Sequence, residues 1–180
     1  MCYTEFEHRH NFASWAAARA AQRGVKGFSV NLAKEALEQC CVMSFVMLPP
    51  SDGEEENFDK LHKKWCGSIC DYFKHKRVVG VTYGRAAKLV AVYLKNMAVL
   101  PDLQSTRAKY IHPPIDSILL SKIPQEIKVK LADDDKARLR NARWTQLGKA
   151  EYFKLLKVLK KINGDEPLWQ LEKYWTVTNT

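Results

Sequence analysis

The sequence lacks any long hydrophobic run. No apolar stretch approaches the ~18 residues that a membrane-spanning helix needs, so no membrane segment is predicted. The first residues also lack the basic and apolar leader that marks a secreted protein. The five cysteines are an odd number, and they do not form two pairs at zinc-ligand spacing. We therefore expect a cytoplasmic protein in a reducing compartment that folds without disulfides, metal or cofactor.

The sequence also lacks an alternation of polar and apolar residues long enough to build a β-sheet. The only strand-like pieces are residues 42–48 and 77–82, and the first could equally be the end of a helix. Internal repeats and low-complexity tracts are absent as well. Apolar residues instead recur at three- and four-residue steps through most of the chain. The predicted fold class is all-α, a compact bundle of about seven to nine helices.

Capping residues set the expected starts of the main helices. Asn11 is expected to cap a helix over residues 12–23, and Ser29 is expected to cap the next one, because short polar side chains accept hydrogen bonds from free first-turn amides. Thr82 and Thr145 hold the same place before two further amphipathic segments. Asp116 is a fifth candidate, since it precedes a short apolar segment.

Prolines and acids mark the clearest break in the chain. Residues 49–57 combine a proline pair, which cannot continue a helix, with acids that repel one another. We expect an exposed acidic loop here, followed by a long helix from Asn57. The chain is then a single helical domain over residues 1–180, in which this loop separates an N-terminal helical pair, or a small lobe, from a basic helical body.

The chain is basic, with a net charge of +9 at pH 7. Residues 61–180 hold 23 Lys and Arg against 11 Asp and Glu, an excess of 12 positive charges. Such localised charge favours a nucleic acid partner, because each phosphate that it neutralises releases condensed counterions. The alternative is a basic surface that serves only solubility.

Two glycines, a lysine and an aspartate carry the clearest chemistry. Gly80 and Gly84 permit a tight turn and a close approach to another chain, and a helix that starts beside them presents amides to a phosphate. Lys88 lies one turn into that helix. Asp116 follows two prolines and precedes an apolar helix, so it is expected to be a helix cap, a catalytic carboxylate, or both.

This order of residues resembles the catalytic region of helix-hairpin-helix DNA glycosylases, over about 40 of the 180 residues. The resemblance implies that Gly80 and Gly84 form the hairpin that grips the DNA backbone. It implies that Lys88 is the nucleophile that attacks the sugar, and that Asp116 stabilises the positive charge on the deoxyribose or deprotonates the nucleophile. The flanking stretches HNFASWAAARAAQRG and PLWQLEKYWTV are similar to a group of uncharacterised bacterial proteins.

The implied function is base excision: a DNA-binding glycosylase, with or without lyase activity, that acts on a modified or mispaired base in duplex DNA. Basic and polar side chains expected to contact the nucleic acid are Arg85, Lys95, Arg107, Lys109 and His112. Trp15 and Arg19 lie four residues apart and could stack a base or clamp a phosphate. Alternatively, Trp15 is a core residue and its arginine neighbour only snorkels outward.

Other interpretations stay open. The first is a non-enzymatic, basic, all-helical module that binds nucleic acid or a protein partner, in the setting of phage defence or a mobile element. The second is a ribonuclease, because Arg107 and His112 resemble the Arg-to-His pair of HEPN ribonucleases. A shared metal ion on the ladder His62, Cys66 and Cys70 is a weaker alternative to three buried side chains.

Overall fold

The computed structural model describes residues 2–127 and 130–175, and these residues form helices and no strand. The α-helices are α1 Glu5–Ala21, α2 Val30–Gln39, α3 Val42–Met47, α4 Glu54–His75, α5 Tyr83–Leu94, α6 Thr106–Tyr110, α7 Ser117–Glu126, α8 Asp133–Asn141 and α9 Lys149–Asn163. A π-helical turn, η1, spans Lys95–Val99, and two 3-10 segments, η2 and η3, span Trp144–Gln146 and Leu168–Tyr174. The all-α prediction is confirmed.

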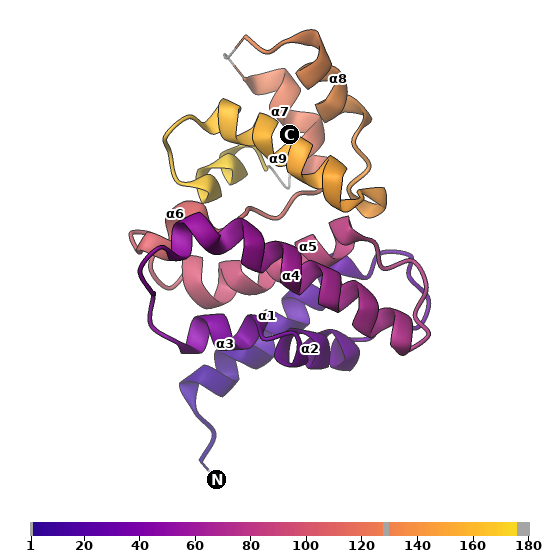
Figure 1. Ribbon diagram of the computed structural model, residues 1–180, viewed down its shortest axis with the longest axis vertical. Helices are drawn as coiled ribbons and strands as arrows, with labels where there is room; N and C mark the ends of the chain where they lie inside the picture. The colour runs from indigo at the N-terminus through magenta and orange to yellow at the C-terminus, as the bar shows by residue number, and fades with distance from the viewer. Residues whose placement is uncertain (1, 128–129, 176–180) are drawn as a thin grey trace.

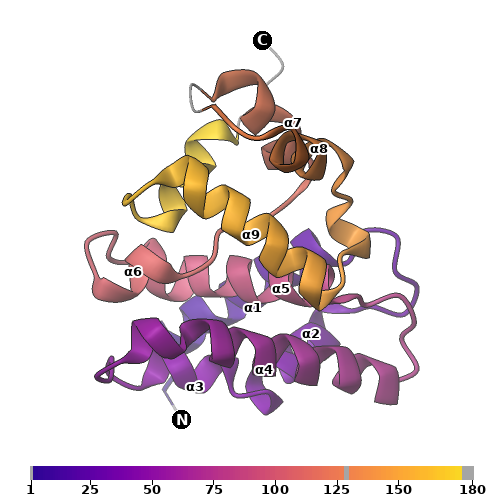
Figure 2. The ribbon, with the colours of Figure 1, turned by 45° about the horizontal axis from the view of Figure 1, so that its top comes forward.

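Helix α5 lies at the centre of the molecule. It packs against α1, α4, α9 and η2, while α7, α8 and α9 lie together above the layer formed by α1 to α6 (Figures 1 and 2). The buried apolar side chains form one cluster that runs from α1 to η3. The N-terminal helices and the basic body therefore share a core.

Burial of α5 on every side overturns one sequence expectation. Eleven of its twelve residues are buried, including Lys88 and also Arg85, which we expected on the surface in contact with nucleic acid. Long basic side chains on one side of a buried helix give it the sequence pattern of a helix with a solvent-exposed polar face. Periodicity alone therefore cannot show that such a helix is covered on every side. The chemistry of Arg85 and Lys88 is therefore that of buried groups.

Thr4 caps α1, so the prediction that Asn11 starts this helix is wrong. Thr4 Oγ1 accepts from the Glu7 backbone N–H at 3.2 Å, and the Glu7 carboxylate accepts from the Thr4 backbone N–H at 2.7 Å, which is a complete capping box. Asn11 lies inside the helix, where its side-chain oxygen accepts from Lys34. Asn11 has the side chain of a typical cap residue, although it lies within the helix.

The acidic loop ends earlier than expected, because α4 begins at Glu54 instead of Asn57. Three acids fill its first turn, where the partial positive charge of the helix N-terminus stabilises them. Glu54 is buried and bound to Arg107, so it belongs to the interior and not to an exposed loop. Of the predicted loop, residues 49–57, only residues 49–53 lie outside a helix.

Helix α9 also begins later than expected. Thr145 lies in η2, and Gly148 is the residue before the helix. The Thr145 carbonyl instead accepts from the hydroxyl of Thr82, so this segment holds the start of α5.

The remaining helix ends follow the sequence more closely. Ser29 and Thr82 cap α2 and α5 as predicted. Helix α7 passes through Pro124 before it ends at Glu126. Among the described residues, no helix is both long and apolar enough to cross a membrane.

Candidate active site around Lys88 and Asp116

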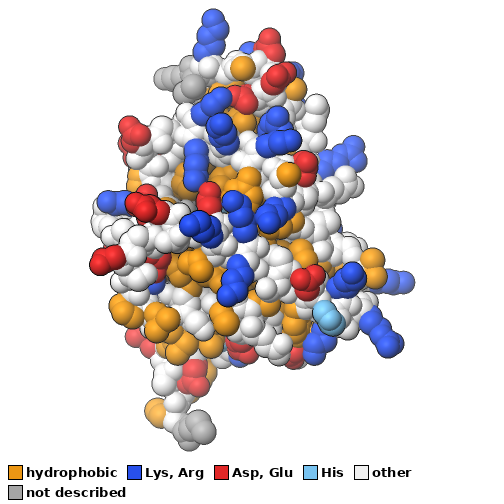
Figure 3. Space-filling view, in the orientation of Figure 1, with side chains coloured by type: hydrophobic (Ala, Val, Ile, Leu, Met, Phe, Trp, Pro, Cys, Tyr) orange, Lys and Arg blue, Asp and Glu red, His pale blue; other side chains and the backbone are white. Residues whose placement is uncertain are grey.

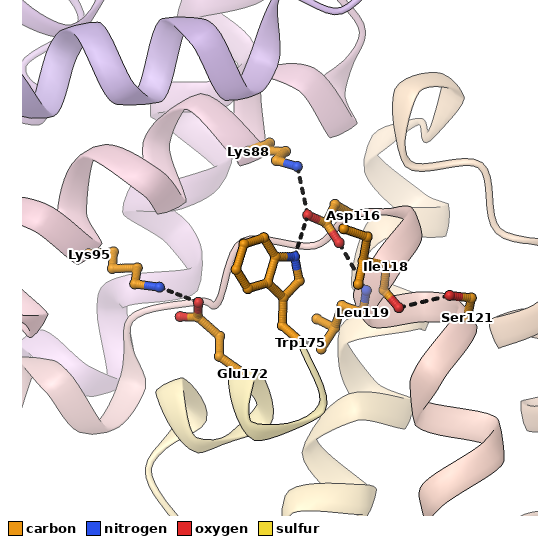
Figure 4. Close-up of polar contacts among 8 residues, drawn as sticks. All are labelled: Lys88, Lys95, Asp116, Ile118, Leu119, Ser121, Glu172 and Trp175. Atoms are coloured by element: carbon orange, nitrogen blue, oxygen red, sulfur yellow. Dashed lines mark hydrogen bonds and ion pairs between the residues drawn. The ribbon is translucent and has the colours of Figure 1, made fainter. Parts of the chain in front are cut away.

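Lys88 and Asp116, predicted from separate segments, meet in the structure. The ammonium Nζ of Lys88 lies 3.0 Å from Oδ2 of Asp116 (Figure 4). The two residues are only 8% and 9% exposed. Lys88 comes from the buried helix α5, and Asp116 comes from the extended segment before α7. The sequence order of these residues therefore corresponds to a spatial pair.

Asp116 has two roles at once. Its Oδ1 accepts from the Leu119 backbone N–H at 2.9 Å, so the prediction that it caps α7 is confirmed. Its backbone is extended, and residues 112–116 lie outside any helix, as the two prolines require. The capping hydrogen bond fixes Oδ1, and it leaves Oδ2 free to accept a hydrogen bond from Lys88.

Trp175 and Glu172 complete this cluster, and we had interpreted Trp175 from sequence only as packing. The indole N–H of Trp175 donates to Oδ2 of Asp116 at 2.9 Å. Glu172 accepts a hydrogen bond from Lys95 in the same region (Figure 4). Trp175 and Asp116 are 59 residues apart, and no local pattern connects them. Sequence periodicity therefore could not find this contact.

A cavity of about 340 Å³ opens beside the cluster. Its volume falls within the range of small-molecule sites. The π-helical turn η1 contributes Lys95 and Asn96 to the wall, and such turns often occur at functional sites. The lining residues are Ala20, Lys88, Val92, Lys95, Asn96, Leu100, Pro114, Asp116, Glu172 and Trp175.

The electrostatic setting of Lys88 lowers the pKa of its ammonium. Burial lowers the pKa of the Lys88 ammonium, the attraction of Asp116 opposes this, and the positive charge of Arg23 adds to the lowering. The ammonium also lies 4.4 Å from the centre of the Trp144 ring. A buried lysine whose pKa is lowered can act as a nucleophile or as an acid–base group.

The two glycines do not form one hairpin. Gly80 is exposed in the loop between α4 and α5, with a φ of 94° that favours glycine. Gly84 is buried inside the first turn of α5, and its N–H donates to the Leu147 carbonyl at 2.9 Å. A Cβ at Gly84 would lie 2.0 Å from the Trp144 carbonyl oxygen. Gly84 therefore serves packing within the protein, and only Gly80 is exposed.

Several expected nucleic acid contacts are used inside the protein. Arg85 donates to the Ala21 carbonyl at 2.8 Å, and burial lowers its pKa. Arg107 donates from Nε and Nη2 to the carboxylate of Glu54, each at 2.7 Å. Lys95 is held by Glu172. All three side chains are thus engaged within the protein, and their contact with phosphates stays a prediction.

His112 is buried as well. Its Nε2 lies 2.9 Å from Asp59, and its Nδ1 lies 3.2 Å from the hydroxyl of Tyr152. Arg107 and His112 thus face different partners, and the structure does not assemble them as a ribonuclease pair. In contrast, Trp15 is 50% exposed, and Arg19 and Lys109 are exposed on the surface.

Positive charge gathers where the sequence reasoning did not place it. Lys and Arg side chains cover the face presented by α9 and α4 (Figure 3). The exposed lysines of α9 are Lys149, Lys154, Lys157, Lys160 and Lys161. A second exposed basic group is residues 74–77, directly before the Gly80 loop. The sequence pattern does not distinguish these lysines from the ordinary solvated face of an amphipathic helix.

The His62 and Cys66 pair is part of the core. Both residues are buried, with Cys66 Sγ 3.7 Å from His62 Nε2, and His62 stacks on Tyr152. Within residues 2–127 and 130–175, no group of three or more His, Cys, Asp and Glu side chains is placed to hold a metal ion.

A scan with models of protein families, a search of curated proteins and a search of solved structures found no match to this chain.

Proposed function

We propose that this protein is a DNA glycosylase that acts through Asp116 and Lys88 on a modified or mispaired base. The observation that carries the proposal is the pair itself: a buried amine 3.0 Å from a buried carboxylate, at the wall of a cavity of about 340 Å³. The chain order of a glycine loop, a lysine and a proline-led aspartate supports it.

In the proposed reaction, a flipped nucleotide enters the cavity, at an unstacking cost of about a few kcal/mol. As the bond from the sugar C1′ to the base breaks, its electron pair leaves with the base. The carboxylate of Asp116 stabilises the positive charge that develops on the sugar. The lowered pKa of Lys88 increases its neutral fraction, and Asp116 can accept the proton that the amine loses.

With lyase activity, the neutral amine of Lys88 attacks C1′ as the base leaves and gives up one proton. The C1′–O4′ bond then breaks, O4′ takes up a proton, and the nitrogen lone pair forms the C1′=N bond of an imine to the opened sugar. Without it, water attacks C1′, and Lys88 serves only to orient Asp116. The exposed groups that can hold the DNA backbone in either case are the Gly80 loop, residues 74–77, Lys109 and Arg19.

Trapping with borohydride tests the proposal. Wild-type protein is incubated with duplexes that each carry one modified or mispaired base, and borohydride reduces any imine to a stable crosslink. We expect a crosslink with wild type and with Lys95→Gln, a cavity-wall control, and none with Lys88→Gln.

Base release tests Asp116 separately. Asp116→Asn should lower the rate by about 100-fold or more, the range for a positioned acid–base group. Asparagine caps helices as well as aspartate does, so this variant keeps α7. If Asp116→Asn releases base as fast as wild type, the proposed role of Asp116 is wrong.

A second candidate function is a non-enzymatic module that binds nucleic acid, and the lysine face of α9 favours it. For this function, replacing Lys154 and Lys157 by Gln should weaken binding to any DNA, while Asp116→Asn leaves binding unchanged. Affinity should also fall steeply as salt rises, because phosphate contacts release counterions. Salt-independent binding would contradict both candidate functions.

A further inference from the structure

The carboxylate of Asp116 is held by three donors from three parts of the chain. The Leu119 amide holds Oδ1, whereas Lys88 and the indole of Trp175 both bind Oδ2, at 3.0 and 2.9 Å (Figure 4). Two donors on one oxygen divide its negative charge between them. The indole N–H therefore competes directly with the lysine that the proposed function uses.

We propose that Trp175 is a positioning residue for Asp116 and Lys88: its N–H fixes Oδ2 toward the cavity and weakens the hold of Asp116 on the Lys88 ammonium. This inference rests on the proposed function for its catalytic consequence. Its effect on the amine itself can be measured without any DNA.

The geometry of η3 supports an ordered role for this tryptophan. The Trp175 backbone N–H donates to the Glu172 carbonyl at 2.8 Å, and the Glu172 side chain binds Lys95 on η1. The side chain of Trp175 is thus attached at both ends, through its backbone to η3 and through its indole to Asp116. At 38% exposure the ring also forms part of the cavity wall, so solvent reaches the site beside it.

Other charged groups also act on Lys88. Arg23, just after α1, repels its positive charge, and Asp116 attracts it. Lys95 and Glu172 line the same cavity but are paired with each other. The ring of Trp144 lies against the ammonium on another side. Among these groups, the indole N–H is the one whose removal would strengthen the Lys88–Asp116 contact.

Trp175→Phe removes this N–H and keeps an aromatic ring in place. The chain provides a matched control in Trp169→Phe, within η3, because the buried Trp169 indole N–H has no hydrogen-bond partner among the described residues. Both variants lose an indole N–H, one within η3 and one directly after it, but only one of these groups touches Asp116. Differences between them therefore report on the Asp116 contact.

The first measurement is the pH dependence of reductive methylation at Lys88. A neutral amine and formaldehyde give an imine and water, and hydride from cyanoborohydride reduces the imine to a methylamine; peptide mass spectrometry identifies the modified lysine. We expect the midpoint for Lys88 to move upward by roughly one pH unit in Trp175→Phe, because the ammonium gains the full charge of Oδ2. Trp169→Phe should match wild type.

The second measurement is base release against pH. Trp175→Phe should lower kcat about tenfold at neutral pH, because one pH unit changes the neutral fraction of the amine tenfold, and should leave KM unchanged. At higher pH the rates of variant and wild type should converge. A loss of packing alone would lower the rate equally at every pH.

The outcomes separate the two proposals. If the Lys88 midpoint moves only in Trp175→Phe but no protein, including wild type, releases any base, the glycosylase proposal fails and the role of Trp175 remains. If Trp175→Phe matches Trp169→Phe in both measurements, or loses rate equally at every pH with no shifted midpoint, the positioning role is overturned.

Discussion

Two buried ion pairs differ in how completely their polar atoms are used. Arg107 and Glu54 form a two-point contact, with Arg107 also bound to the Leu48 carbonyl and Glu54 also accepting from Tyr110. Lys88 and Asp116 meet through one contact beside a cavity. Both pairs border a cavity, of about 760 Å³ beside Glu54 and of about 340 Å³ beside Lys88 and Asp116. The difference lies in their partners, because every nitrogen of the Arg107 guanidinium donates to a protein oxygen, whereas the Lys88 ammonium donates to Asp116 alone.

The pKa values of the two basic side chains also shift in opposite directions. Hydrogen bonding to Glu54 raises the pKa of Arg107, whereas burial lowers the pKa of Lys88. Folding therefore stabilises the charge on Arg107 and destabilises the charge on Lys88. Under the proposed function, this difference separates a pair that only stabilises the fold from a pair in which one group can lose its proton.

The largest expected effect separates the pairs by stability. Arg107→Met leaves Glu54 buried without its partner and should lower the free energy of unfolding by about 3–5 kcal/mol. Lys88→Met leaves Asp116 with the Leu119 and Trp175 donors, so the loss should stay below about 2 kcal/mol. Urea denaturation measures both. Equal losses would erase the distinction between the two pairs.

A smaller effect is expected at the helix that carries Lys88. Gly84→Ala should lower the free energy of unfolding by about 3 kcal/mol, since backbone at 2.0 Å from the new Cβ must move. Gly67→Ala on α4 is the control, because nothing lies within 4 Å of its added Cβ. That control should be neutral or stabilising by up to about 1 kcal/mol. Thermal or urea unfolding gives both values.

Acid should test the buried histidines of the core. Burial lowers the pKa of His62 and, against the attraction of Asp59, that of His112. The unfolded state then binds more protons below a pH of about 6.5, so stability is full above this value and falls as the pH drops. We expect His62→Gln to flatten the fall in stability between pH 7 and pH 5, because the variant has no group to protonate at this position. An unchanged slope in unfolding curves would count against this explanation.

The smallest effect is at alkaline pH. Because folding lowers the pKa of Lys88, the unfolded chain holds its proton longer, and the stability of wild type should rise relative to Lys88→Met as the pH passes from the folded pKa toward about 10.4. The difference in Tm between these two proteins, followed from pH 8 to pH 10.5, measures it. A difference that stays constant with pH would show that Lys88 is not destabilised as an ammonium.

Local features of the fold were predictable from sequence, and features set by distant packing were not. Ser29, Thr82 and Asp116 cap helices as predicted, because capping depends on three or four neighbouring residues. The start of α4 was misplaced, since a buried partner 53 residues away decides the place of Glu54.

The site shows the same division. The chain order singled out Lys88 and Asp116, and the structure brings them together. Periodicity could not predict that α5 is covered on every side, which removed Arg85 from the surface. It also could not predict Trp175, whose indole reaches Asp116 only after the chain has passed through α7, α8 and α9.

The π-helical turn η1 sets the phase of the chain that follows it. A π turn accommodates one residue more than an α turn, and each residue rotates an α-helix by about 100°. Deleting one residue near the end of η1 would allow α5 to continue as regular helix, and it would turn Leu100 by about 100° relative to the cavity wall. This side of the cavity therefore depends on the extra residue that η1 accommodates.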